Sequence, residues 1–115
     1  YRVIVQELTY LMNQPFSNEK ILVVFSDLME NSDIVSFYDD KSFSKITSDA
    51  RDLQNSFGIA QPLPESLLGV RVYFVFQPRT REEDLRYRKV SSFFKTMLEE
   101  KGAIVTIQAH NQSYN

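Results

Sequence analysis

Three side chains with oxygen atoms lie just after a fully apolar segment of this 115-residue chain, and they are the residues best placed for chemistry. Ser26 and Asp27 end the apolar run from Ile21 to Phe25, and Glu30 comes three residues later. In open α/β sheets, ligands bind beyond the carboxyl ends of the strands, which is where Asp27 would lie. Because hard cations take oxygen ligands, we predict that Asp27, with Ser26 and Glu30 as further candidates, contributes to a Mg²⁺ or Mn²⁺ site.

Each of these residues also has an ordinary structural explanation. An aspartate after a strand readily caps the next turn by accepting hydrogen bonds from main-chain NH groups, so a cap is the alternative role for Asp27. Glu30 belongs to the polar stretch 30–33, which ends in Asp33 and whose spacing matches no calcium-binding loop. A solvated loop is therefore the preferred interpretation of that stretch.

Few other residues are candidates for catalysis. His110 is the only histidine, and its position after the last predicted strand favours a tail residue over a general base. The chain has no cysteine and no Gly-x-Ser-x-Gly motif, so a nucleophilic triad is not supported. The three glycines are isolated, so no glycine-rich phosphate loop exists and no nucleotide cofactor is expected. We therefore expect a protein that is not an enzyme.

A basic cluster occupies positions 79–89. Its members are Arg79, Arg81, Arg86, Arg88 and Lys89. Such a cluster at a helix N-terminus could bind a phosphate or an acidic partner. Acidic residues at positions 82–84 lie between the basic ones, so surface charges that pair with one another are the preferred prediction.

The hydrophobic pattern predicts the elements that position these residues. Apolar residues at helical spacing predict helices over 1–12, 40–57 and 81–101, the last of which follows a capping box formed by Thr80 and Glu83. Apolar runs predict strands over 21–25, 70–76 and 103–107, and a short strand or packed loop over 34–38. A strand without polar alternation is typical of parallel sheets covered on both faces. We therefore predict a three-layer α/β/α fold with a mainly parallel, Rossmann-like sheet of three to four strands.

The composition fits one α/β domain over residues 1–115, with 43% hydrophobic and 24% charged residues. A net charge of −2 argues against a nucleic-acid partner bound by bulk electrostatics. No apolar run approaches the roughly 20 residues needed to cross a bilayer, so no membrane span is expected. The lack of cysteine is compatible with either the cytoplasm or the periplasm.

The order of these elements resembles the C-terminal half of a von Willebrand factor A-type domain. In that family the fourth strand ends in a Thr-Asp or Ser-Asp pair, which Ser26 and Asp27 match. The predicted helix over 1–12 would match the helix before that strand, and the elements from residue 40 onward would match those after it. The resemblance covers nearly the whole chain and implies a domain that binds proteins, often through a divalent metal.

Two parts of the family's pattern are missing. No Asp-x-Ser-x-Ser motif occurs, and Leu28 stands where the family commonly has glycine. The resemblance therefore implies a fragment whose first strands lie upstream of Tyr1, so that metal would bind tightly only to the intact protein. It also implies that the strand from Ile21 to Phe25 has an unpaired apolar edge, which is a known route to association. We therefore expect self-association through this edge.

Three functions follow from these residues. The leading one is a non-enzymatic protein-binding module, with Asp27 contributing to a divalent-metal site in the intact protein. The second is a receiver-like phospho-acceptor domain, because an aspartate after an apolar strand resembles the acceptor of response regulators. Against it, the chain has no acidic pair closing an earlier strand. The third is a metal-dependent hydrolase that uses Asp27, Glu30 and Asp33.

Overall fold

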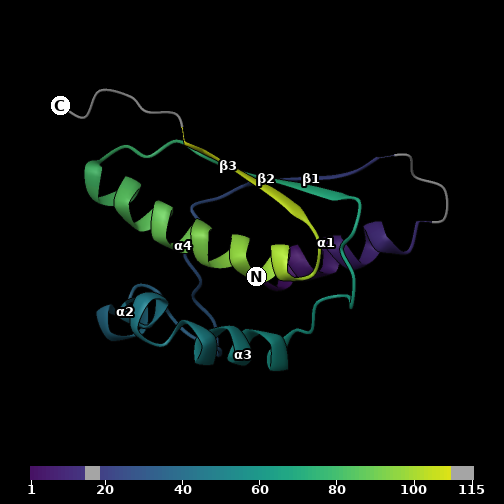
Figure 1. Ribbon diagram of the computed structural model, residues 1–115. Coiled ribbons are helices and arrows are strands. Elements are labelled where there is room, and N and C mark those ends of the chain that lie inside the picture. Colours follow the sequence, from purple (N-terminus) through teal and green to yellow (C-terminus); the bar gives the residue numbers. More distant parts are fainter. Residues whose placement is uncertain (15–18, 110–115) are drawn as a thin grey trace.

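The computed structural model describes residues 1–14 and 19–109, which form an α/β fold around a parallel sheet (Figure 1). In chain order the elements are α1 (Arg2–Met12), β1 (Lys20–Phe25), α2 (Asp40–Ser48), α3 (Ala50–Ala60), β2 (Val70–Phe76), α4 (Arg81–Glu100) and β3 (Ile104–Ala109). The predicted α/β class and the three main strands are confirmed.

The predicted helix over 40–57 is wrong in one respect, because the structure divides it at Asp49 and continues it to Ala60. Asp49 has φ −135° and ψ 43°, which no helix contains. The hydroxyls of Thr47 and Ser48 both donate to the carbonyl oxygen of Ser44 near this break. Serine, threonine and aspartate compete with helical hydrogen bonds in this way, which explains why the helix stops here. Residues 34–38 were predicted as a short strand or a packed loop, and the structure has the loop: Ser36 makes an isolated bridge to Asn31, and Phe37 is buried.

The sheet has the order β1-β2-β3, and each strand is parallel to its neighbour. Val23 lies beside Tyr73, and Tyr73 lies beside Thr106, so these three residues form one row across the sheet. β1 and β3 each have a single neighbour among the described residues and are the edges of the sheet. The prediction of a mainly parallel sheet of three to four strands is therefore confirmed at three.

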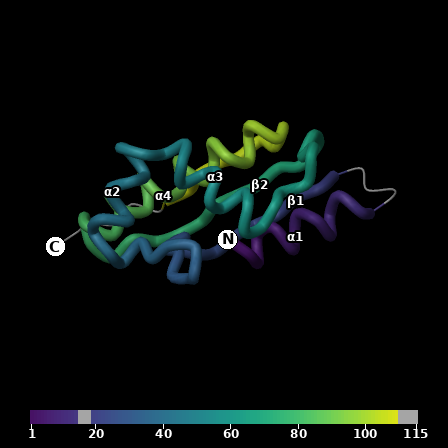
Figure 2. The backbone as a smooth tube through the Cα atoms, turned by 90° about the horizontal axis from the view of Figure 1, so that it is seen from below, coloured from purple at the N-terminus to yellow at the C-terminus, as the bar shows by residue number. Residues whose placement is uncertain are grey.

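All four helices lie on the same side of the sheet. In Figure 1 the strands lie above α1 and α4, and α2 and α3 lie on the far side of α4. The view from below shows α1 running alongside β1, at the opposite end of the molecule from α2 (Figure 2). The predicted three-layer α/β/α arrangement is thus not found in the described residues. Right-handed crossovers that add each new strand in the same direction place every connecting helix on one face, which gives this result.

The core lies between the sheet and α4 and continues between α4 and the outer helices. Thr80 caps α4 by accepting a hydrogen bond from the main-chain NH of Glu83 at 3.0 Å, so this half of the predicted capping box is confirmed. The other half differs, because the Glu83 carboxylate accepts from the main-chain NH of Arg79 and not from that of Thr80. The apolar stripe predicted for this helix is buried, as Tyr87, Val90 and Phe94 show. On the sheet, β2 supplies the central residues of the core: Val70, Val72 and Phe74.

Candidate functional site

Ser26 and Asp27 lie at the carboxyl end of β1, where they shape the next turn. The Ser26 Oγ accepts a hydrogen bond from the NH of Leu28 at 3.0 Å. The Asp27 Oδ1 accepts one from the NH of Met29, also at 3.0 Å. Leu28 between them has φ 61°, in the left-handed region that glycine favours, yet its side chain is buried. Both polar side chains therefore hold a turn that drives Leu28 into the core.

Glu30 points to a different partner. Its Oε1 accepts a hydrogen bond from the main-chain nitrogen of Tyr1 at 2.9 Å. The Tyr1 ring stacks on Phe94 with ring centroids 5.7 Å apart, and its hydroxyl donates to the carbonyl oxygen of Gln61 at 3.1 Å. Burial, and then the Glu30 carboxylate, raise the pKa of the Tyr1 hydroxyl to about 12. Glu30 thus anchors the start of α1 to the loop after β1.

The three predicted metal ligands are engaged as hydrogen-bond acceptors in the structure. Each already accepts a hydrogen bond within its own loop or from Tyr1. No group of three or more histidine, aspartate and glutamate side chains that could hold a metal ion occurs among residues 1–14 and 19–109. As arranged here, these residues do not fit a divalent ion, so a metal role for Asp27 in a larger protein stays a prediction.

A small cavity lies where the sequence places the site, at the carboxyl ends of β1 and β2. Its volume is about 100 Å³, and its walls include Asp27, Tyr38, Phe76 and Tyr87. This is well below the roughly 300 Å³ of the smallest usual ligand pockets. Burial raises the pKa of the Tyr87 hydroxyl to about 12, and this hydroxyl donates to the carbonyl oxygen of Gln108. The cavity therefore offers room for a few waters beside a neutral phenol.

The basic cluster at the start of α4 is largely neutralised by its own helix. Ion pairs at a spacing of four residues join Arg79 to Glu83, Arg86 to Glu82, and Arg88 to Asp84. The main-chain NH and the guanidinium of Arg79 lower the pKa of the Glu83 carboxyl. The prediction of self-paired surface charge is confirmed for these three arginines.

The largest departure from the sequence prediction is on the face of the sheet that carries no helix. β1 was expected to be buried on both faces, and this is wrong, because its residues alternate between half-buried and exposed. Phe25 is 79% exposed, and Ile21 and Val23 are each 44% exposed. On β2 and β3 the same face carries Arg71, Tyr73, Val75, Ile104, Thr106 and Gln108. The face is apolar over β1 and becomes more polar towards β3.

The apolar surface continues around the edge of β1 onto α1. A cavity of about 340 Å³ follows this edge, and Val3, Ile4, Val24 and Phe25 are among its walls. Val3 is 67% exposed on the flank of α1. Four of the ten large apolar residues that are exposed in the described part of the chain are Val3 and the β1 residues Ile21, Val23 and Phe25. We call this surface, made of Val3, Ile21, Val23 and Phe25, the β1 edge patch.

The exposed face was not predicted, although the sequence holds a signal for it. Arg71, Thr106 and Gln108 alternate with buried or half-buried residues along β2 and β3, which is typical of strands with one solvated face. β1 has no such polar residue between Ile21 and Phe25, so its own sequence gives no indication of exposure. His110, set aside as a tail residue, lies outside the described residues.

The comparisons with known proteins add no relative. No family model, no curated protein and no solved structure matches this chain. The resemblance to von Willebrand factor A-type domains therefore stays a prediction. Among the residues that the structure describes, no helix is both long and apolar enough to cross a membrane.

Proposed function

We propose that this chain is a non-enzymatic protein-binding module whose docking surface is the β1 edge patch, and that a second copy of the chain can occupy it. The exposure of Phe25 at the edge of the sheet carries the proposal. Contiguous exposed apolar surface on a soluble protein marks sites of association.

The main chain of β1 supports the same surface. The NH of Ser26 donates to the carbonyl oxygen of Val75 on β2 at 3.1 Å. Because successive residues of a strand direct their NH and CO groups to opposite sides, Phe25, Val23 and Ile21 direct theirs away from β2. The residues with exposed apolar side chains are therefore also those whose main-chain groups can pair with an added strand.

The size of the surface indicates that the edge takes part. Three strands about 4.8 Å apart and six residues long give an open face of roughly 15 by 20 Å. That footprint is about 300 Å², whereas a stable interface buries about 800 Å² on each partner. Two sheets stacked face to face would bury only the open face. An interface that also includes the strand edge and the flank of α1 buries more area and comes closer to that of a stable interface.

The test measures molecular mass against concentration by sedimentation equilibrium. The variant Val23→Lys places a charge in the β1 edge patch, and lysine on an edge strand opposes pairing. Thr106→Lys is the matched control, because Thr106 lies on the same open face and in the same row across the sheet. We expect the wild-type mass to rise with concentration, the dissociation constant of Val23→Lys to increase about tenfold or more, and Thr106→Lys to behave as wild type.

Two results would contradict the proposal. One is a wild-type chain that stays monomeric at every concentration measured. The other is an equal loss of association in Val23→Lys and Thr106→Lys, since that would assign association to the general charge of the face.

A further inference from the structure

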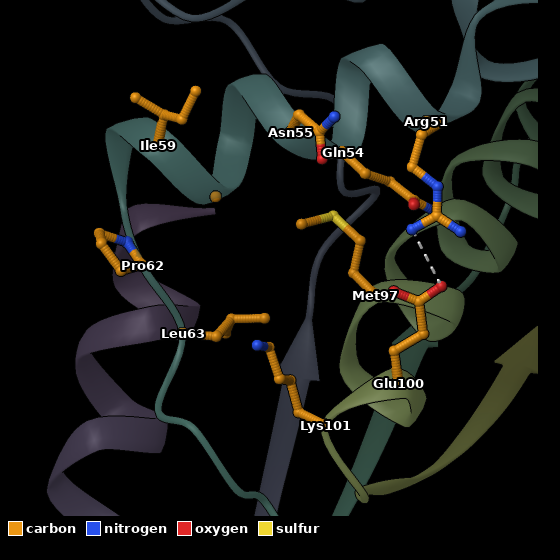
Figure 3. Close-up of a pocket in the computed structure, with 10 residues that line it drawn as sticks. Arg51, Gln54, Asn55, Ile59, Pro62, Leu63, Met97, Glu100 and Lys101 are labelled. Carbon is orange, nitrogen blue, oxygen red and sulfur yellow. Dashed lines mark ion pairs between the residues drawn. The ribbon is translucent and has the colours of Figure 1, made fainter.

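A groove that the β1 edge patch does not include lies on another part of the chain. It lies between α3 and the last turn of α4, and the segment after α3 closes one end (Figure 3). Its volume of about 460 Å³ is within the range of ligand pockets. Met97 and Leu63 reach into it from opposite walls, and Ile59 stands at its rim (Figure 3). The groove thus has an apolar floor that is large enough for a side chain.

Gly58 lines this groove, and the fold of the chain itself does not require a glycine at this position. It lies within α3, where alanine is a far better helix former. A Cβ at this position would meet no atom within 4 Å, and its φ is not in the left-handed region. Neither the backbone nor the packing of the chain therefore requires glycine here. The missing side chain instead allows a second molecule to approach the main chain of α3.

The charged groups of the groove favour an anion. Arg51 and Glu100 form an ion pair of 3.6 Å across one end, and both side chains are well exposed. Lys101 has no carboxylate partner among residues 1–14 and 19–109, and its amine points towards Leu63 (Figure 3). With two cations and one anion in its walls, the groove is complementary to a single negative charge.

The length and the polar walls of the groove fit an extended peptide. Arg51 and Gly58 lie about 10 Å apart along α3 at 1.5 Å per residue, a distance that about three extended residues span. The side-chain amides of Gln54 and Asn55 line the same wall, and each can both donate to and accept from a peptide main chain. We propose that the groove binds an extended peptide segment in which an aliphatic side chain enters over Gly58 and an adjacent carboxylate pairs with Lys101.

The test follows the amide resonances of the ¹⁵N-labelled chain during titration with the acetylated and amidated tripeptide Ala-Leu-Glu. We expect saturable shifts at Gln54, Asn55, Gly58 and Lys101. Ala-Leu-Gln, which lacks the charge, and Ala-Gly-Glu, which lacks the aliphatic group, should each bind about tenfold more weakly. The absence of saturable shifts at these residues, or equal binding of the three peptides, would overturn the proposal.

Two variants connect the effect to the groove. Gly58→Ala adds one methyl group to the floor and should weaken binding of Ala-Leu-Glu about tenfold while the fold is kept. The matched control is Ser56→Ala, on the same helix but outside the groove, which should bind as wild type. Lys101→Gln should reduce binding of Ala-Leu-Glu to the level of Ala-Leu-Gln. Wild-type binding by Gly58→Ala would overturn the proposal.

Discussion

The hydroxyl of Tyr87 donates a hydrogen bond of 3.1 Å to the carbonyl oxygen of Gln108, and this bond ties the inner side of α4 to the last strand. The phenol must stay protonated to make this bond. Burial acts in the same direction and raises its pKa to about 12. Tyr1, whose hydroxyl donates to the carbonyl oxygen of Gln61, has a pKa raised to about the same value. Two interior contacts of the fold thus depend on neutral tyrosines.

The chain should therefore lose stability in alkali. A tyrosine whose pKa is near 10 in the unfolded chain and about 12 in the folded one contributes stability that is complete below pH 10. That contribution disappears as the pH rises from 10 towards 12. Tyr87→Phe should cost about 1 kcal/mol at pH 7, because it removes the hydrogen bond, and should make the decline with pH shallower. Urea unfolding at a series of pH values from neutral into this alkaline range measures both effects, and parallel pH profiles for the two proteins would contradict the assignment.

Gly102 should not tolerate a side chain. It has φ 104°, and a Cβ there would lie 2.9 Å from the Leu68 side chain. We expect Gly102→Ala to lower the free energy of unfolding by about 1–3 kcal/mol, since it combines backbone strain with this contact. Gly58→Ala is the contrasting variant, because it relieves a helix of glycine without a clash, and should raise the free energy of unfolding by roughly 0.5–1 kcal/mol. Thermal or urea unfolding that gives the two variants the same sign would contradict the structure.

Leu28 combines a left-handed backbone conformation with a buried side chain. Replacing it by glycine should therefore destabilise the fold less than replacing it by alanine. Leu28→Ala loses the burial and keeps the strain, whereas Leu28→Gly loses the burial and relieves the strain. The left-handed conformation costs a non-glycine residue about 1–2 kcal/mol, so the glycine variant should be the more stable of the two by about 1 kcal/mol. Chemical unfolding of both variants provides the measurement. A more stable alanine variant would show that the turn is not left-handed in solution.

The two faces of the sheet should respond very differently to truncation of phenylalanine. Phe74 is fully buried towards α4, and Phe74→Ala should cost about 3–5 kcal/mol. Phe25 is 79% exposed on the face without helices, so Phe25→Ala should change the stability of the monomer by less than about 0.5 kcal/mol. Unfolding must be measured at a concentration where the chain is monomeric. A cost for Phe25→Ala close to that of Phe74→Ala would mean that another part of the protein covers this face.

The sequence was a good guide wherever a local pattern decides the structure. The side-chain cap by Thr80 and the apolar stripe that includes Tyr87 and Phe94 depend on spacing within one helix, and both were predicted. The exposure of β1 depends instead on which elements cover the sheet. An apolar run such as the one from Ile21 to Phe25 can form a strand that is covered on both faces or a strand with one exposed face. Only the polar alternation in β2 and β3 distinguished the two possibilities.

The candidate site was harder to predict for a related reason. Asp27 at the end of a strand fits a metal ligand and a turn cap equally well by residue type, and the hydrogen bond to Met29 is visible only in three dimensions. Glu30 was predicted as its neighbour in a site, but a contact with Tyr1, distant in sequence, engages it. The groove at Gly58 was also missed, since α3 and the end of α4 are brought together by the fold rather than by any sequence motif.

The parallel register has a consequence for the order in which the sheet can assemble. Lys20 and Val70 are about 50 residues apart in sequence, whereas Arg71 and Ile104 are about 33 apart. Closing the longer loop costs about 0.4 kcal/mol more chain entropy, and α4 fills the shorter connection with local hydrogen bonds. We therefore expect β2, α4 and β3 to form the folding nucleus and β1 to join it last. During synthesis, β1 would leave the ribosome before β2 and β3. Its apolar residues would stay unpaired, and accessible to chaperones, until those strands have formed.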